Sequence, residues 1–292
     1  MNRNATARPL SPFRSLRNLL LCALPILGLA GCSVNGVTAT REVSQSVADA
    51  KSVVVSGENG SVELIHDPAA LTMQVSAVIR CTSDTQEKAD ARAAAATLTT
   101  VADESGKVRV GVEFPPRDPA SAIWMYSGSG DAARIVIRAA SLEGLEVSTS
   151  NGSIDVGAFR GAAKLSTSNG SIEIKDHAGP VDARSSNGAI RASGVRAPIS
   201  ATTSNGRIVV ALAADAQGDI ELASSNGSVT LDLGSSWQGT VTADTSNGKV
   251  DLSGGEVVKK QGTKTMTIGD AAKAKATIET SNGRVTVRAA KK

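Results

Sequence analysis

The stretch Thr149-Ser150-Asn151-Gly152-Ser153-Ile154 is one copy of a short motif that returns along most of the chain. An Asn-Gly pair flanked by apolar residues at the same spacings occurs at eight positions: Asn59, Asn151, Asn169, Asn187, Asn205, Asn226, Asn247 and Asn282. Between Asn151 and Asn247, successive copies are 18, 18, 18, 21 and 21 residues apart. A repeat of nearly constant period is the sequence signature of a stacked, quasi-one-dimensional fold.

Each copy predicts a strand, a corner and a second strand. Apolar residues stand six and four residues before the asparagine and three and five residues after it, as Leu145, Val147, Ile154 and Val156 do around Asn151. Such alternation is typical of strands. The copies could be chained hairpins, because Asn-Gly is a common hairpin turn, or coils stacked about 4.8 Å apart.

We favour an all-β fold, a β-solenoid of 18–21-residue coils with one short helix in its N-terminal part. Chained hairpins would form an open sheet of well over ten strands, which is larger than twisted sheets usually reach. A coil also has a fixed circumference, which explains the constant period. In a solenoid the Asn-Gly pairs are repeat corners, because both residues accept left-handed φ angles. Stacked asparagines can also hydrogen-bond as a ladder, with ligand binding by that ladder as the alternative.

The chain begins with a charged and then apolar leader. Four arginines precede an apolar run over residues 19–30, which is the layout of a secretory signal and is too short to span a membrane. The run ends in Leu29-Ala30-Gly31-Cys32, which resembles the lipobox of bacterial lipoproteins. The resemblance implies lipidation of Cys32, cleavage before it and, with Ser33 next, anchoring in the outer membrane.

Removal of residues 1–31 changes the charge of the protein. The whole chain has 31 basic and 28 acidic residues, and the leader holds four arginines and no acid, which leaves 27 against 28. A net charge of −1 gives no support for nucleic-acid binding, which would need a basic face. With Cys22 removed and Cys32 acylated, only Cys81 remains, so no intrachain disulfide is possible, and we expect Cys81 to be a buried thiol.

The expected domain organisation has four parts. They are a signal peptide (1–31), a tether (32–50), an N-terminal part with the first coil, a helix and capping strands (51–140), and solenoid repeats (141–292) with an insertion at about 254–275. Ser83 and Gln86 form a capping-box pattern ahead of a helix over residues 84–98. The insertion is predicted to be a hairpin over residues 259–267.

The T-S-N-G-x-I repeats behind a lipobox resemble the DUF4097 family of β-strand-repeat envelope proteins, which is related to the GIN-domain (DUF2807) group. The similarity runs from about Ser52 to Arg288. It implies a right-handed β-solenoid and an adhesin-like role.

Few residues suggest chemistry. Asp155 and Glu173 occupy the same outward column and could stack as paired carboxylates, but Arg191 follows them, which favours a solvated salt-bridge ladder. His66 and His177 form no metal-binding pattern. We therefore expect no enzyme activity, no metal and no cofactor.

Aromatic residues suggest a contact surface instead. Trp124 and Tyr126 are candidate contact residues, since such side chains are common interface anchors. The alternative is that Trp124 plugs the solenoid end. Trp237 is expected to pack over an adjacent coil, with sugar stacking as the alternative.

The sequence thus predicts a lipid-anchored cell-envelope module that acts in binding or as a structural element. Its expected partners are the membrane, through the acylated cysteine, and a protein or polysaccharide of the envelope. The alternatives are an envelope-stress sensing or regulatory component and a polysaccharide-active enzyme.

Overall fold

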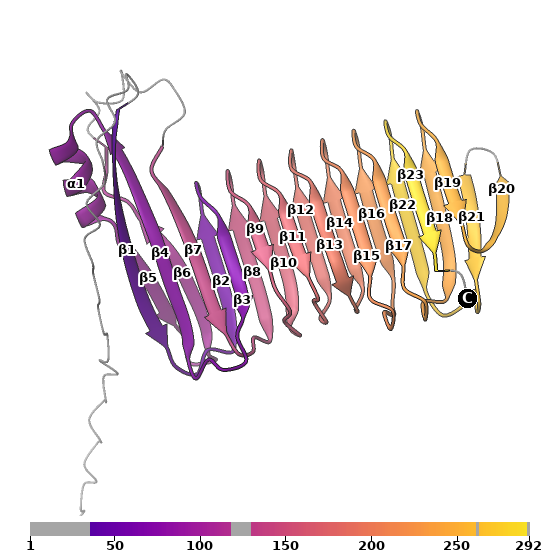
Figure 1. Cartoon of the computed structure of the whole chain (residues 1–292), viewed down its shortest axis with the longest axis horizontal. Coiled ribbons are helices and arrows are strands. Elements are labelled where there is room, and N and C mark those ends of the chain that lie inside the picture. Colours follow the sequence, from indigo (N-terminus) through magenta and orange to yellow (C-terminus); the bar gives the residue numbers. More distant parts are fainter. Residues whose placement is uncertain (1–35, 118–129, 261–262, 291–292) are drawn as a thin grey trace, which may run out of the picture.

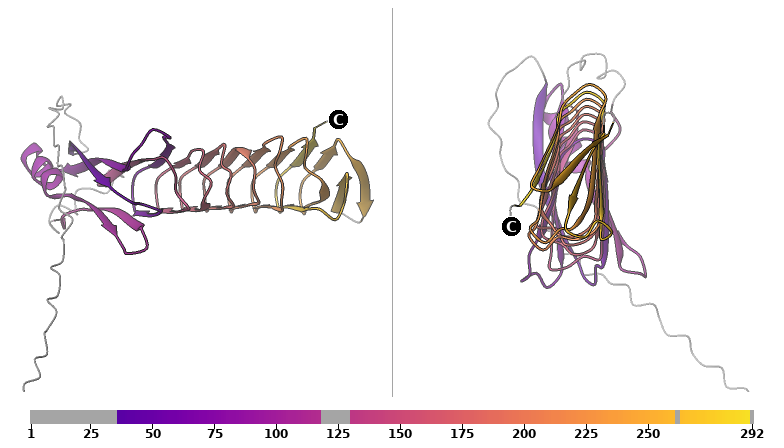
Figure 2. Two further views of the ribbon diagram at one scale, coloured as in Figure 1. Left: turned by 90° about the horizontal axis from the view of Figure 1, so that it is seen from below. Right: turned by 90° about the vertical axis from the view of Figure 1, so that its right-hand side faces the viewer.

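The computed structural model describes residues 36–117, 130–260 and 263–290. Two long sheets face each other along a rod, with the single helix of the described residues, α1 (Gln86–Ala95), at one end (Figure 1). Seen along the rod, the coils superimpose as a flattened tube (Figure 2). The expected all-β solenoid with one short helix is therefore confirmed.

The two sheets have 11 and 12 strands. In spatial order the first sheet contains β1 (Val37–Val47), β4 (Met73–Ser83), β7 (Ala132–Ala139), β3 (Val62–His66), β9 (Ile154–Val156), β11 (Ile172–Lys175), β13 (Ile190–Val195), β15 (Ile208–Leu212), β17 (Val229–Leu233), β23 (Val285–Ala289) and β19 (Val250–Ser253). The second contains β20 (Glu256–Lys260), β21 (Thr263–Ile268), β18 (Gly239–Thr245), β22 (Lys275–Thr280), β16 (Ile220–Ser224), β14 (Ile199–Thr203), β12 (Val181–Ser185), β10 (Ala162–Thr167), β8 (Gly144–Thr149), β2 (Ser52–Gly57), β6 (Lys107–Glu113) and β5 (Thr97–Ala102).

Each repeat copy contributes one strand to each sheet. Neighbouring copies pair in parallel and in register, so that Val147 lies opposite Leu165 and Leu165 opposite Ala183. Among the described strands, the register shifts only between Ser193 and Val195, where β13 pairs with β15. Parallel pairing excludes chained hairpins, whose neighbours would be antiparallel. The inward columns are buried as the alternation predicts, and Ala183 and Ala201 are fully buried where the two sheets leave little room.

The coils do not stack strictly in sequence order. The last coil, β22–β23, lies between β16–β17 and β18–β19. At the other end, β2–β3 lies between β6–β7 and β8–β9. At the N-terminal end, the inner coil β2–β3 comes earlier in the chain than the outer coil β6–β7. At the C-terminal end, the inner coil β22–β23 comes later in the chain than the outer coil β18–β19 (Figure 1). The expectation that each copy stacks on the previous one holds only in the middle of the rod.

Antiparallel strands and the helix close the N-terminal end of the rod. Residues 37–47, which the sequence analysis assigned to a tether, form β1 and pair with β4 over their whole length. Arg41 donates from Nη1 to the Ala94 carbonyl at 2.6 Å and to the Ala96 carbonyl at 3.2 Å, at the C-terminal end of α1. The cationic side chain satisfies carbonyls that the helix leaves unpaired.

The helix is shorter than predicted and is capped differently. It begins at Gln86, with Thr85 as N-cap, whose side chain accepts a hydrogen bond from the Lys88 amide. Ser83 instead ends β4. The expected capping box is therefore replaced by a threonine cap two residues further along the chain.

A hairpin closes the C-terminal end. The insertion forms β20 and β21, as predicted, although both strands extend beyond residues 259–267. β21 pairs antiparallel with β18 and buries Met266, while the Lys264 ammonium donates to the Val250 carbonyl in the opposite sheet. The hairpin therefore covers the open end of the core (Figure 2).

Candidate binding site

The Asn-Gly corners are tight because neighbouring backbones almost touch. A Cβ atom built on Gly188 would lie 1.6 Å from the Gly170 carbonyl oxygen, and the corner glycines from Gly152 onward all show such distances of 1.6–2.1 Å. Of the eight corner glycines only Gly60 has a positive φ, at +126°. The left-handed φ expected for these corners is therefore wrong for seven of them, and close approach is what requires glycine.

The asparagine side chains form one continuous ladder along this edge. Apart from the first asparagine, each donates from Nδ2 to Oδ1 of its neighbour toward the N-terminal end of the rod, at 2.7–3.0 Å. The order is Asn59, Asn151, Asn169, Asn187, Asn205, Asn226, Asn282 and Asn247. We call this row the asparagine ladder.

A second row of hydrogen bonds explains the Ser or Thr that stands two residues before each asparagine of the main run. Its hydroxyl is directed inward and donates to a glycine carbonyl of the neighbouring corner, as Thr167 does to Gly152 at 3.0 Å and Ser185 to Gly170 at 3.2 Å. Three residues of the T-S-N-G motif are thus used by stacking. The motif is architecture along the rod, and function has to be sought where the ladder ends.

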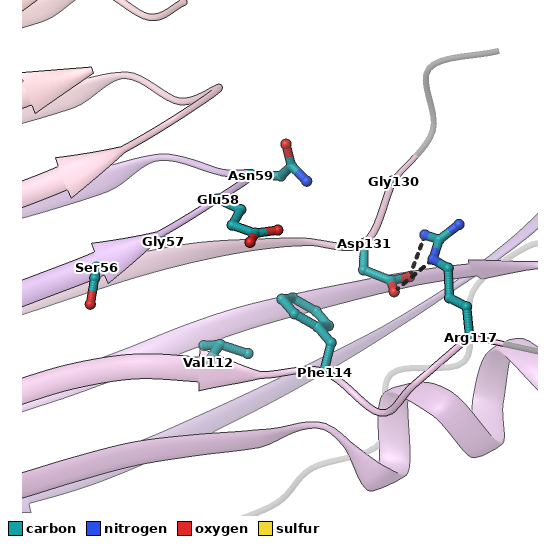
Figure 3. Close-up of a pocket in the computed structure, with 9 residues that line it drawn as sticks. All are labelled: Ser56, Gly57, Glu58, Asn59, Val112, Phe114, Arg117, Gly130 and Asp131. Carbon is teal, nitrogen blue, oxygen red and sulfur yellow. Dashed lines mark hydrogen bonds and ion pairs between the residues drawn. The ribbon is translucent and has the colours of Figure 1, made fainter. Parts of the chain in front are cut away.

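The ladder ends beside a cavity at the N-terminal end of the rod. By register, Val62 lies opposite Ile135, so Ala132 stands where the β6–β7 coil would carry its asparagine. The cavity next to it has a volume of about 590 Å³. It is lined by Ser56, Gly57, Glu58, Asn59, Val112, Phe114, Arg117, Gly130 and Asp131 (Figure 3). We call it the ladder-end pocket.

An ion cluster forms one wall of the pocket. Asp131, whose side chain is 9% exposed, lies 2.6 Å from Nη2 of Arg92 and 3.1 Å from Nη2 of Arg117. Arg92 also donates to the carbonyls of Pro115 and Pro116, at 3.1 and 2.9 Å. Because Arg92 belongs to α1, the cluster connects the helix to both chain segments that border the pocket.

The opposite walls combine an apolar surface with polar groups of the first coil. Phe114 and Val112 pack on the core from the end of β6, and both face the cavity (Figure 3). Glu58 and Asn59 belong to the first corner. A hydrogen bond from the Asn151 backbone N–H to the Glu58 carbonyl at 2.8 Å fixes the backbone of this corner. An apolar wall with a few placed polar groups is typical of a ligand site.

The predicted carboxylate pair is brought together but is balanced by cations. Asp155 lies opposite Glu173 in register and also opposite Glu63. Burial raises the pKa of Asp155, and the nearby charges of Glu173 and Glu63 raise it further. Arg134 pairs with Glu63 at 2.7 Å and Lys175 with Glu173 at 2.8 Å. The face thus has salt bridges, but they use Arg134 and Lys175 and not Arg191, from which the ladder was predicted.

His177 and Trp237 are core residues at the other edge of the rod. His177 is fully buried, its Nε2 lies 2.9 Å from the Gly161 carbonyl oxygen, and burial lowers its pKa. Trp237 is 2% exposed and donates from Nε1 to the Gly218 carbonyl at 3.1 Å. Its packing role is confirmed, and its burial leaves no face for sugar stacking.

The remaining predicted site residues lie outside the described part of the chain. These are the lipobox residues Leu29, Ala30 and Gly31 with Cys32, and the candidate contact residues Trp124 and Tyr126. Within residues 36–117, 130–260 and 263–290, no group of three or more His, Cys, Asp or Glu side chains could hold a metal ion. No helix among them is long and apolar enough to cross a membrane. Cys81 is buried, as expected.

The pocket itself was not predicted. A signal existed in the two alternating stretches Lys107–Phe114 and Arg134–Ala139, which resemble the halves of a coil but lack Asn-Gly between them. Recognising this irregular coil would have directed attention to Asp131 and Phe114. The partnership of Arg92 with Asp131 has no sequence signature, because the two residues are 39 positions apart.

A family model described as a domain of unknown function, DUF7330, matches residues 164–291. This is not the DUF4097 family that the repeats resemble. No curated protein matches the chain.

Several solved structures share similarity over most of the chain. A provisionally designated cell adhesion protein of Clostridium sporogenes aligns with 86% of this chain and 100% of its own, at 11% identity and a TM-score of 0.39. A provisionally designated adhesin of Bacteroides fragilis aligns with 89% and 100%, at 12% identity and a TM-score of 0.41. A provisionally designated lipid binding protein of Parabacteroides distasonis aligns with 88% and 98%, at 13% identity and a TM-score of 0.24.

Proposed function

We propose that this protein is a lipid-anchored, non-enzymatic binding module of the bacterial cell envelope, and that it holds its partner in the ladder-end pocket. The observation that carries the proposal is the composition of that pocket. It combines the apolar surface of Phe114 and Val112 with the Glu58 carboxylate, the Asn59 amide and the Arg117–Asp131 ion pair. Along the rod the repeat residues are used in stacking, whereas these groups are presented to a cavity.

The position of the pocket agrees with an anchor at Cys32. Val37 begins β1 and pairs with Ser83, and the neighbouring Thr82 amide donates to Asp131 of the pocket wall at 3.2 Å. Val37 is five positions after Cys32, a length of chain that spans at most about 18 Å when extended. An acyl chain on Cys32 would therefore keep the pocket end of the rod near the membrane, which we propose to be the outer membrane.

An envelope polysaccharide fits the pocket better than a protein partner. Carboxylates and a carboxamide can bind hydroxyl groups, and an aromatic face packs against the apolar face of a sugar ring. Catalysis is not part of the proposal, because salt bridges occupy both carboxylates, Glu63 and Glu173, that stack beside Asp155 on the outer face.

The anchor and the binding function can be tested separately. With globomycin, which blocks lipoprotein signal cleavage, or with Cys32→Ala, the protein should lose its mature mass and its membrane association. An unchanged mature mass, or a Cys32→Ala protein that stays with membranes, would refute the anchor.

Binding is tested by sedimentation of the purified protein with isolated peptidoglycan and with outer-membrane polysaccharide. The wild type should sediment with one of them, and Phe114→Ala should not. The matched control is Val257→Ala, which alters a 38% exposed residue of the C-terminal hairpin and should sediment like the wild type. If Phe114→Ala sediments equally well, the pocket is not the binding site. If the double variant Asp155→Asn with Glu173→Gln abolishes turnover of a polysaccharide, the protein is an enzyme.

A further inference from the structure

The asparagine ladder has a direction, and its donor end is open. The Nδ2 of each of the other seven asparagines donates toward the N-terminal end of the rod, so Asn59 accepts from Asn151 at 2.7 Å and has its own Nδ2 outside the ladder. Among the described residues, no acceptor receives a hydrogen bond from this Nδ2. Hydrogen bonds in a chain polarise one another, so the terminal amide of eight aligned amides is a stronger donor than an isolated one.

The position that would continue the ladder contains no amide. Ala132 stands there by register, and its methyl group cannot accept a hydrogen bond. Gly130 lies close by, and a Cβ atom built on it would be 3.4 Å from Asn59 Nδ2. Because Gly130 has no side chain, it leaves space beside the Asn59 side-chain amide (Figure 3). A carbonyl oxygen of a ligand placed there would accept the hydrogen bond and continue the stack.

The rest of the pocket indicates what this carbonyl belongs to. Phe114 and Val112 offer an apolar surface that suits a methyl group, and the exposed Glu58 carboxylate accepts hydrogen bonds from hydroxyl groups. A carbonyl, a methyl group and nearby hydroxyls occur together in the acetamido group of an N-acetylated amino sugar. We propose that the ladder-end pocket binds such a sugar in an envelope glycan, with its acetamido carbonyl as the next member of the asparagine ladder.

This inference rests on the proposed function and names the ligand class of the same pocket. An asparagine-containing peptide would also supply a carboxamide. A sugar is favoured because its hydroxyls can donate to Glu58 and because a carboxamide NH₂ has no methyl group to place against Phe114.

The test measures binding of the full mature protein in detergent by calorimetry. The probes are a tetramer of N-acetylglucosamine, the same tetramer without acetyl groups, and an asparagine-rich peptide. We expect binding of the acetylated tetramer and at least tenfold weaker binding of the other two probes. Asn59→Asp keeps the oxygen that accepts from Asn151 but removes the donor, and it should weaken binding about fivefold to tenfold, as loss of one hydrogen bond does.

Two further variants make the test specific for the ladder. Ala132→Asn would place a carboxamide in the position of the ligand and should abolish binding while leaving the fold intact. Asn247→Ala removes one hydrogen bond at the opposite end of the ladder and should bind like the wild type, which controls for general loosening.

Each result decides the matter. Equal binding of acetylated and deacetylated tetramers, preference for the peptide, or no binding of any probe would overturn the acetamido proposal. An unchanged affinity in Asn59→Asp would overturn it as well. In all of these cases the proposed function stands if the wild type sediments with an envelope polysaccharide and Phe114→Ala does not, and it fails if the wild type does not sediment or if that variant sediments normally.

Discussion

Replacing Gly188 by alanine should open the solenoid locally. The new Cβ atom would lie 1.6 Å from the Gly170 carbonyl oxygen, and neither atom belongs to a flexible side chain. Because non-bonded carbon and oxygen atoms do not approach within about 3 Å, the two corners must separate by more than 1 Å. No rotamer change relieves this contact, since the methyl group of alanine has none.

The magnitude follows from the hydrogen bonds that such a shift breaks. They are the ladder bond from Asn187 to Asn169 at 2.8 Å, the bond from Ser185 Oγ to the Gly170 carbonyl at 3.2 Å, and the bond from the Asn187 backbone amide to the Ser168 carbonyl at 2.9 Å. At about 1 kcal/mol each, their loss lowers the free energy of unfolding by about 3 kcal/mol. That is a large part of the stability of an ordinary domain.

Urea unfolding followed by circular dichroism measures the change, and hydrogen exchange localises it. The matched control is Gly144→Ala, whose Cβ atom would meet Ser52 Cβ at an ordinary 3.5 Å. Exchange should accelerate in β10 to β13 for Gly188→Ala alone. If the two variants unfold within about 0.5 kcal/mol of each other, glycine is not required by close approach, and our explanation of the motif is wrong.

Three further predictions concern other parts of the rod. Burial lowers the pKa of His177 below its usual 6.5, so the unfolded chain binds a proton that the folded chain does not, and stability falls as the pH drops below about 6.5. In urea titrations at pH 7 and pH 5, His177→Phe should therefore lose less stability than the wild type when the pH is lowered. An equal loss of stability between these two pH values in both proteins would contradict the prediction. Burial raises the pKa of Cys81 to about 11. In a chain lacking residues 1–32, Cys81 should therefore not react with Ellman's reagent at pH 8 until the protein is unfolded, and rapid reaction of the native chain would contradict a buried thiol. Cysteines placed at Asn226 and Asn282 should form a disulfide on mild oxidation, whereas cysteines at Asn226 and Asn247 should not. The reason is that adjacent coils are about 4.8 Å apart and second neighbours about twice that. The reverse result would mean that the coils stack in the order of the sequence.

The middle of the rod could be predicted from sequence because its information is local and repeated. Apolar alternation around Asn151 and its copies gives both strands of a coil, and the constant period gives the stacking. The order of the coils at the ends could not be predicted. Asn247 and Asn282 have the same local pattern, so nothing in either copy reveals that the later one lies further inside the rod.

The physical reason for the invariant glycine was also beyond local reasoning. In an isolated copy, Gly152 indicates a positive φ, because that is what Asn-Gly usually means in a turn. In the stack its φ is ordinary, and the carbonyl of Gly60 occupies the place of a side chain. That carbonyl comes from a residue 92 positions earlier, and only the fold brings the two together.

The candidate site is the least predictable part, because it arises where the repeat fails. Arg92, Asp131 and Phe114 come from three segments without a shared pattern, and Asn59 differs from its seven sister residues only in what lies beyond it. Sequence reasoning assigned all eight asparagines the same role. In the structure seven of them donate to another asparagine, while Asn59 faces a pocket.

The central claim, that the donor end of the asparagine ladder is where a ligand binds, is tested most directly by NMR of the side-chain amides. Titration of ¹⁵N-labelled protein with the N-acetylglucosamine tetramer should shift the Asn59 side-chain amide resonances first and most strongly. Effects should decrease along Asn151 and Asn169, and Asn247 at the far end should stay unchanged. Shifts centred on any other part of the rod, with Asn59 unaffected, would contradict the account.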